Sequence, residues 1–360
     1  MPLDSFITTG VDVIRQAGEQ TRQAVDALAA PNFHKLVRRS ALQMCAAVAV
    51  DAGQSLFGGV LHQAGIAVFQ VASSQEKEEP RTYPFWVAPS LPDDEKKMAI
   101  QQKLEELASS DQSIQNFVTA MGWKHAYDGM QPGAYESAAA VGDYVRDLLE
   151  WSELYRLAGI LEGTRYLLQG FQPILLRDGA LRFGTTAANI SKPLGRLFSD
   201  LNVPIFGVTK DSLLLSNPVI RLWLRKHKVL ECDGPFCVWM EAKDFEDLGW
   251  RIERYFGKSG FRFGHYAIIR FDGLPGSKDL FAVDIPDHLF DDHRDQVLLL
   301  LSGLIQQASA TAYPIPGYPI ALRQAHNKVV LTDDRARMLE NSLRRSLPPE
   351  TYEFLKMLES

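Results

Sequence analysis

The sequence predicts a mixed α/β fold in which one sheet is flanked by helices, with helical extensions at both ends of the chain. Apolar runs of strand length cluster in the first part of the chain and then alternate with helical segments, an order typical of a mixed sheet covered by helices. Several of these runs stop at a charged residue. Because ligand sites in such sheets form outside the strand ends, these residues are the first candidates for a functional site.

The composition is that of an ordinary soluble chain. Its 360 residues are 46% hydrophobic and 23% charged, enough to bury a sizeable core. No apolar run approaches the length of a membrane span, and the N-terminus lacks the apolar centre of a signal peptide. An odd number of cysteines, three, indicates a reducing compartment without a disulfide framework. We therefore expect a cytoplasmic protein with no membrane partner.

The net charge of −6 does not by itself indicate nucleic-acid binding, because neutralising phosphates requires clustered Lys and Arg. It leaves room for a local basic groove. The densest basic patch is residues 221–228, Arg-Leu-Trp-Leu-Arg-Lys-His-Lys, with Trp223 interleaved. A solvated helix face explains the patch as well as a binding surface does.

The first part of the chain reads as a helix followed by strands. Residues 3–45 predict a helix, and residues 1–45 are taken as an N-terminal helical segment. Residues 44–51 form a continuous apolar run that ends at an acid, Asp51, and residues 58–72 predict one or two further strands. The polar, proline-punctuated stretch 73–92 predicts a loop.

A helical region comes next. Residues 92–122 begin with acids in the first turn of a predicted helix. Residues 134–169 predict a long helix whose apolar face includes Glu162, with Glu153 nearby. Carboxylates are rarely buried unless they are paired or bind a metal, so an acid in this position needs a partner.

The second half of the chain repeats the pattern of a strand that ends at a charge. Residues 174–183 begin with an apolar run that ends at Asp178, and Gly179 predicts a turn after it. Residues 203–208 predict a strand followed closely by Lys210, and residues 280–284 predict one that ends at Asp284. The other expected elements are helices at 192–200, 213–229 and 286–310, strands at 236–241 and 261–272, and a terminal helix from about 333 to 358.

The charged residues at these positions suggest a metal site that acts on phosphodiesters. The candidates are Asp51, Glu162, Asp178, Lys210, Asp284 and His326. Carboxylates with one imidazole suit Mg²⁺ or Mn²⁺, and converging carboxylates repel one another unless a cation neutralises them. Two divalent ions held in this way would activate water and stabilise the leaving oxygen. Lys210 would neutralise phosphate charge, and His326 would act as a ligand or as a general acid/base.

Each candidate also has a structural explanation. Asp51 and Asp178 could form turns, Glu162 could be a surface acid of a helix, Asp284 could precede a proline turn, and His326 could cap a helix. A single metal site is the more economical explanation of the set, but spacing alone leaves both open.

Five motifs in order resemble the NurA nuclease family. They are Val-Asp-Ala-Gly-Gln-Ser at 50–55, Leu-Leu-Arg-Asp-Gly-Ala-Leu at 175–181 with Glu162 in the preceding helix, Gly-Val-Thr-Lys-Asp-Ser at 207–212, Val-Asp-Ile-Pro at 283–286, and the segment 317–326 that runs from Gly-Tyr-Pro-Ile-Ala-Leu to Ala-His. Single motifs of this kind are weak, whereas the ordered set is fairly specific. It covers about residues 46–330.

The resemblance implies an RNase H-like core and a Mn²⁺-dependent nuclease, with Mg²⁺ as an alternative metal. It implies single-strand endonuclease and 5′–3′ exonuclease activity on DNA single strands and duplex ends, in end resection and repair. It also implies a toroidal homodimer that works with HerA, a hexameric ATP-driven DNA translocase. On this basis residues 46–332 would be the nuclease domain, with a helical insertion at about 92–150, and residues 333–360 a C-terminal helix.

The resemblance also assigns roles to residues. It implies that Asp51, Glu162, Asp178 and His326 hold metal, that Tyr318 lines the same site and that Lys210 takes part in catalysis. Glu162 rests on a looser local match than the aspartates, so Glu153 is the alternative, and Asp284 would shape the site without touching metal. The chain has Ala52 where the family often has Gly, a change that should not affect metal binding.

Two other classes of function compete with the nuclease. A non-catalytic assembly or DNA-binding subunit on the same fold would keep the sheet and lose the acids, which are present here. A sugar kinase or ATPase on an RNase H-like core would need a glycine-rich phosphate loop, and the sequence contains no Walker-type motif. The chain would therefore need an ATPase partner for processive work.

Overall fold

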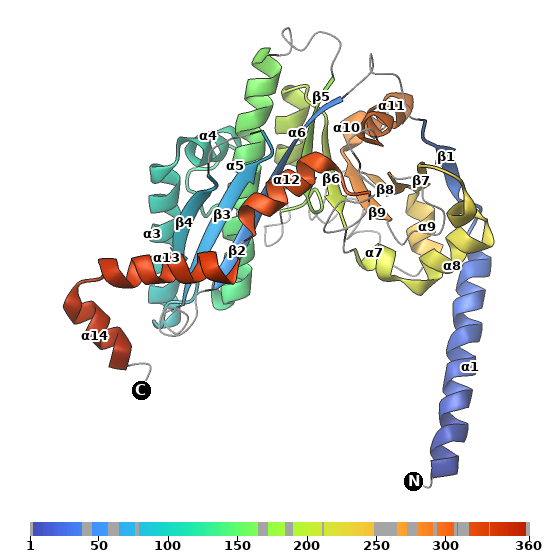
Figure 1. Cartoon of the computed structure of the whole chain (residues 1–360), viewed down its shortest axis with the longest axis horizontal. Coiled ribbons are helices and arrows are strands. Elements are labelled where there is room, and N and C mark those ends of the chain that lie inside the picture. The colour runs from blue at the N-terminus through green and yellow to red at the C-terminus, as the bar shows by residue number, and fades with distance from the viewer. Residues whose placement is uncertain are drawn as a thin grey trace.

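The computed structural model describes most of the chain (Figure 1). The described residues are 3–37, 45–56, 65–75, 79–164, 172–183, 190–210, 212–247, 265–271, 280–290, 294–305, 308, 317–330 and 332–357. Helices and strands are mixed along the chain, as the sequence predicts.

The strands of the described residues form one nine-stranded mixed sheet with the order β1-β7-β8-β9-β6-β5-β2-β3-β4. Their bounds are β1 Asn32–Lys35, β2 Cys45–Leu56, β3 Ile66–Ser73, β4 Arg81–Trp86, β5 Gln172–Asp178, β6 Ile205–Thr209, β7 Phe236–Met240, β8 His265–Arg270 and β9 Phe281–Ile285. Strands β2, β5 and β6 run parallel to one another in the middle of the sheet, and the other pairs are antiparallel.

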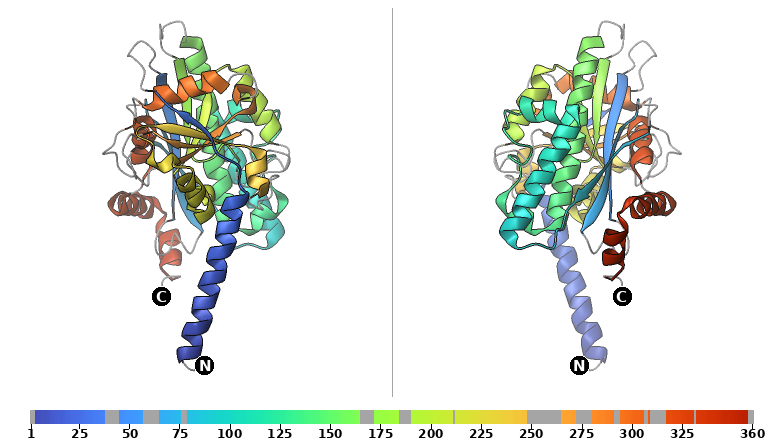
Figure 2. Two further views of the ribbon diagram at one scale, coloured as in Figure 1. Left: turned by 90° about the vertical axis from the view of Figure 1, so that its right-hand side faces the viewer. Right: turned by 90° about the vertical axis from the view of Figure 1, so that its left-hand side faces the viewer.

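Helices flank this sheet and extend beyond it. Their bounds are α1 Leu3–Ala27, α3 Asp93–Ser110, α4 Gln112–Ala120, α5 Ala138–Thr164, α6 Ser191–Asp200, α7 Leu213–Ser216, α8 Pro218–Lys226, α9 Ala242–Asp247, α10 Asp287–Phe290, α11 Arg294–Ile305, α12 Ile320–Val329, α13 Asp333–Ser346 and α14 Pro349–Met357, with short 3-10 turns η2 at Pro132–Glu136 and η4 at Val229–Glu231. Helix α1 projects from the body, and α13 and α14 extend at the other end of the chain (Figures 1 and 2). Among the described helices, none combines the length and the apolar character that crossing a membrane requires.

Side chains of the central strands alternate between two hydrophobic cores, because successive residues of a strand point to opposite faces of the sheet. On β5, Leu175 packs into the core formed with α3, α4, α5 and α6. Its neighbours Ile174 and Leu176 pack into the opposite core, formed with α11 and α12. The next residues of the strand, Arg177 and Asp178, continue this alternation and carry charge to both faces.

Several predicted elements differ from the structure. The helix predicted for residues 3–45 ends at Ala27, and β1 follows and pairs with β7, because Pro31 does not fit a continuing helix. The loop predicted for 73–92 contains β4, which tolerates Pro84 because β4 is at an edge of the sheet.

Two predicted helices are interrupted by caps. The side chain of Asp111 accepts a hydrogen bond from the Ser113 backbone N–H, so α4 begins there and 92–122 is two helices. Asn217 caps α8 in the same way, with Pro218 in its first turn, so 213–229 is also divided. The predicted start of the second strand, residues 58–64, lies outside the described residues.

Candidate metal centre

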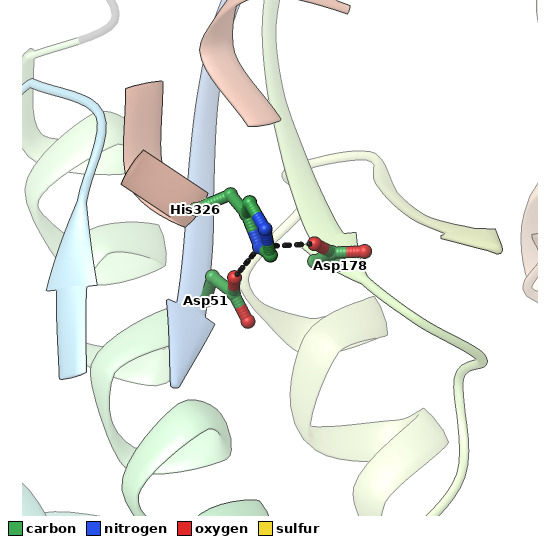
Figure 3. Close-up of side chains that lie close together, drawn as sticks. All are labelled: Asp51, Asp178 and His326. Carbon is green, nitrogen blue, oxygen red and sulfur yellow. Dashed lines mark hydrogen bonds and ion pairs between the residues drawn. The ribbon is translucent and has the colours of Figure 1, made fainter. Parts of the chain in front are cut away.

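Three predicted site residues meet at one point of the structure. Asp51 of β2, Asp178 at the end of β5 and His326 of α12 each offer one ligand atom, and these atoms all lie within 4.8 Å of one another. The Nδ1 atom of His326 lies 2.8 Å from Oδ2 of Asp51 and 3.4 Å from Oδ2 of Asp178. Figure 3 shows the imidazole between the two carboxylates.

The register of two parallel strands brings the aspartates together. Val50 of β2 is the partner of Arg177 of β5, so the next residues, Asp51 and Asp178, are level with each other. Each lies two residues after an apolar residue of the core that contains α12, Ala49 on β2 and Leu176 on β5, and alternation along the strands therefore turns both carboxylates towards that helix. The apolar pattern that sets the register thus also sets the separation of the acids.

Helix α12 delivers the histidine because it packs close to β2. Leu322 and Ala325 are buried in the core that covers this face, and His326 is the next residue. Gly53 allows this approach, since a Cβ atom at that position would lie 2.3 Å from the backbone oxygen of Val329.

Two further predicted residues lie beside the cluster. The Lys210 Nζ atom, just beyond β6, lies 3.2 Å from Oδ2 of Asp178. It also lies 5.2 Å from the centre of the Tyr318 ring. Tyr318 is fully buried, and its hydroxyl interacts with the Asp178 carboxylate and helps to lower the pKa of that carboxyl. The neighbourhood thus contains one cation and one hydroxyl beside the carboxylates.

The electrostatics of the cluster are those of two acids sharing one protonated base. Burial raises the pKa of Asp51 to about 6. Burial also acts to raise the pKa of Asp178, but hydrogen bonding to His326 and the charge of Lys210 outweigh it and lower that pKa. Hydrogen bonds to Asp178 and Asp51 raise the pKa of His326 to about 9. In the metal-free protein, the imidazolium occupies the place where a cation would neutralise both carboxylates.

The donor set fits a hard or borderline divalent ion. Two carboxylates and one imidazole suit Mg²⁺ or Mn²⁺, and the short separation of their ligand atoms is compatible with one ion contacting all three. The three residues also line a cavity of about 670 Å³. Its remaining lining residues are Ala52, Gly53, Gln54, Ser55, Arg146, Val329 and Val330. A ligand can therefore reach the carboxylates from outside.

Arg146 adds a cation to this cavity. It is on α5, its side chain is 40% exposed, and its guanidinium contacts Asp143 at 3.3 Å. No sequence pattern singles it out, because an arginine on a helix is common. Its position in the cavity makes it a candidate for contact with a ligand phosphate.

The helix acids predicted from the sequence lie outside the cluster. Glu162 is exposed in the last turn of α5. Glu153, the alternative, is fully buried, but its carboxylate is paired with Arg81 and Arg156. The structure brings neither carboxylate to the aspartates, so the implied role of Glu162 as a metal ligand is not supported by its position.

Asp284 lies next to the centre without joining it. It accepts a hydrogen bond of 2.6 Å from the backbone N–H of Leu181. This bond holds the turn that follows Asp178. A role in shaping the site remains a prediction.

Glu150 is the acid of α5 that lies beside the centre, and it is not among the candidates predicted from the sequence. Its carboxylate accepts a hydrogen bond from the Ala52 N–H at 3.1 Å and from Arg177 Nε at 2.7 Å. Burial raises its pKa to about 7. Glu162 is twelve residues away, about 18 Å along the helix axis at 1.5 Å per residue. Glu150 could have been predicted because it lies between two apolar residues, Leu149 and Trp151, a pattern that indicates a buried acid with a partner.

Comparison with known proteins gives structural matches only. No protein-family model matches the sequence, and no curated protein sequence matches it. Among solved structures the chain is similar to the NurA nuclease from Sulfolobus solfataricus, at 13% identity and a TM-score of 0.39, covering 97% of this chain and 99% of that one. It is also similar to NurA bound to dAMP and manganese, at 10% identity and a TM-score of 0.37, and to a further NurA structure at 10% and 0.38, each covering 98% of both chains. Similarity at this level does not assign an activity to this chain.

Proposed function

We propose that this chain is a metal-dependent nuclease that hydrolyses phosphodiester bonds in DNA. The observation that carries the proposal is the convergence of Asp51, Asp178 and His326 in an open cavity. Buried acids that only stabilise a fold are enclosed by the protein, whereas Asp51 and Asp178 face a space that a ligand can enter.

The chain's own residues divide the work of such a reaction. Asp51, Asp178 and His326 would hold the divalent ion, which when bound activates water and neutralises charge on the phosphate. Lys210, beside Asp178, would neutralise a phosphate oxygen. Arg146, which lines the cavity, would bind a second phosphate of the same strand.

The finer features of the function are part of the same proposal. We propose Mn²⁺ as the ion and DNA single strands and duplex ends as substrates, cut by single-strand endonuclease and 5′–3′ exonuclease activity. We further propose that a homodimer works in the cytoplasm with a HerA-type translocase in end resection and repair. The motifs in their order support these features, and the strand order β4-β3-β2-β5-β6 supports an RNase H-like core.

The role of Tyr318 and the domain limits complete the proposal. Tyr318 is proposed to line the site beside Lys210. The domain limits 1–45, 46–332 and 333–360 are proposed units of the chain. Glu162 is left out of the proposed metal ligands because of its exposed position.

Incubation with linear and circular single-stranded DNA, with and without Mn²⁺, tests the proposal. We expect the wild type to degrade both substrates only with the metal, and Asp178→Ala to degrade neither. Asp200→Ala, which changes an exposed aspartate at the end of α6, is the matched control and should keep full activity. Undiminished degradation by Asp178→Ala, or no metal-dependent degradation by the wild type, would contradict the proposal and favour a non-catalytic subunit.

A further inference from the structure

We propose that a second cavity, at the β1 edge of the sheet, is a non-catalytic binding site for the phosphodiester backbone of a nucleic-acid strand. The proposal rests on the proposed nuclease function in one respect, since the strand would be DNA that also reaches the metal centre. It assigns a role to the basic stretch 221–228, which the metal centre does not use.

The cavity has a volume of about 550 Å³ and lies between two segments that are distant in sequence. The connection after α1 and strand β1 form one wall, and the end of α8 with η4 forms the other. The lining residues are Ala30, Pro31, Phe33, Lys35, His227, Lys228, Val229, Glu231 and Cys232.

The charges at this cavity favour an anionic ligand. Lys35 and Lys228 line it, and Arg225 is exposed in the last turn of α8. Within the described ranges none of these three cations has an ion-pair partner, whereas Lys226 between them is paired with Asp26 at 2.8 Å. Glu231 is the one acid in the lining. In a chain of net charge −6, unpaired cations from two separate segments form a local positive surface.

Helix α8 holds its basic side chains outward. Ile220, Trp223 and Leu224 are fully buried against the strands. The Trp223 indole N–H donates to the backbone oxygen of Ala29 at 2.7 Å, which ties α8 to the segment that carries the other wall of the cavity. Trp223 is therefore no stacking platform for a base, and the cations between these buried positions face solvent.

Lys228 has a backbone conformation that needs a reason. Its φ of 58° is in the left-handed region, which is strained for a residue other than glycine. A glycine there would end α8 without that strain, but it would remove the side chain from the cavity. The strained backbone thus places a lysine side chain at the rim of the cavity that Lys35 also lines.

The distance between the two cavities predicts a length requirement for the ligand. In the sheet order, β1 is separated from β5 by five strand spacings, or about 24 Å. This distance is a minimum, because Lys35 shares the face of the sheet that packs against α8, whereas Asp178 is on the opposite face, which packs against α12. A strand that reaches both cavities must pass an edge of the sheet and needs at least about seven phosphates, at about 3.4 Å each. A substrate of about three nucleotides that occupies the metal centre cannot also contact Lys35 and Lys228.

The test compares long and short substrates in the double variant Lys35→Gln/Lys228→Gln. Glutamine at 228 keeps a side chain in the left-handed conformation, so the backbone strain is unchanged. Binding of an oligonucleotide of about 20 nucleotides, measured by fluorescence anisotropy in EDTA, should weaken about tenfold, and its salt slope should fall by about 1.4. Cleavage of a trinucleotide with Mn²⁺ should be unchanged. The control Lys124→Gln removes an exposed lysine elsewhere, and Lys35→Arg/Lys228→Arg should restore binding.

The outcomes separate this site from the nuclease itself. A wild type that neither binds nor cleaves DNA would contradict the proposed function. If the wild type cleaves DNA and the double variant binds the long strand with wild-type affinity and salt slope, this second site is overturned and the nuclease proposal is not. An acidic protein partner would then be the better candidate ligand for the surface. Equal loss of trinucleotide cleavage in the double variant would also overturn it, because the lysines would then act on the metal centre.

Discussion

Arg177 and Asp178 are neighbours at the end of β5, and they enter two charged clusters that differ in kind. Arg177 is 4% exposed and binds Asp147 and Glu150 on α5, with its guanidinium 5.0 Å from the centre of the Trp151 ring. It also donates to the backbone oxygen of Arg182 at 2.6 Å. Asp178, on the opposite face, lines an open cavity with Asp51 and His326.

The two clusters differ in their access to solvent. In the Arg177 cluster the guanidinium donates to acids and carbonyl oxygens and is closed off from solvent, so its charges stabilise the protein around it. The Asp178 cluster has two carboxylates beside the cations of His326 and Lys210, and it opens to solvent through the cavity. A ligand can therefore enter and replace the protein groups that contact these carboxylates.

The largest effect is expected from Asp178→Asn. Removing one of the proposed ligand charges should lower the rate of DNA cleavage about 10⁴-fold, or about 5.4 kcal/mol in the barrier. The free energy of unfolding should change by no more than about 1 kcal/mol, because the cluster is not a main support of the fold. Single-turnover cleavage and urea denaturation measure the two quantities. A large loss of stability with retained cleavage would reverse the distinction between the clusters.

Arg177→Met should have the opposite result. It leaves Asp147 and Glu150 buried without their cation, and removal of one partner of a buried ion pair costs about 3–5 kcal/mol. Denaturation should show that loss. Arg156→Met, which changes a partly exposed partner of Glu153 on the same helix, should cost less, because Glu153 keeps Arg81. A similar loss of stability in both variants would show that the ion pairs of Arg177 stabilise the fold no more than that of Arg156.

Glu150→Gln tests the residue that connects the two clusters. Glutamine can still accept from the Ala52 N–H but loses the charge that binds Arg177. Because Ala52 follows Asp51, we expect Mn²⁺ affinity to fall about 10- to 100-fold, as it does when a group that orients a ligand is changed. Glu153→Gln is the matched control, a fully buried acid on the same helix that should leave Mn²⁺ affinity unchanged. Equal Mn²⁺ affinity in the two variants would show that Glu150 supports only the fold.

Metal binding should depend on pH because the metal displaces a proton. His326 has a pKa raised to about 9, so below that pH an ion must replace the proton of its imidazolium, which contacts both aspartates. Asp51 has a pKa of about 6 and is ionised above it. We expect affinity for the metal to rise about tenfold per pH unit between these values, with release of about one proton. Calorimetric titration in buffers of different ionisation enthalpy measures the number of protons released on metal binding. His326→Gln should abolish this release.

The smallest effect is expected from Arg146→Gln. If Arg146 binds a phosphate of the strand equally in the ground and transition states, KM should rise about tenfold while kcat changes little. Arg146→Lys keeps the charge and should recover part of the loss. A fall in kcat at constant KM would instead place Arg146 in the transition state.

The centre of the site could be predicted from the sequence because strand ends are visible there. Apolar runs that stop at Asp51 and Asp178 define two strands, and their parallel register follows from burying both runs on the same faces. Lys210 was placed near them by the same reasoning.

The helix acid could not be predicted in this way. Glu150, Glu153 and Glu162 are all on α5, and only the face that meets the sheet decides which of them approaches Asp51. That face depends on packing against distant strands, which the local pattern does not contain. Strand β1 was missed for a similar reason, since four residues pair with β7, about two hundred residues later in the chain.

Titration of the metal-free protein with Mn²⁺ tests the central claim most directly. The wild type and Asp200→Asn should bind the ion equally, with saturation detected by calorimetry or by the loss of the free Mn²⁺ resonance signal. Asp178→Asn should lose that binding while remaining folded. If Asp178→Asn binds Mn²⁺ as tightly as the wild type, the cluster of Asp51, Asp178 and His326 is not the metal centre.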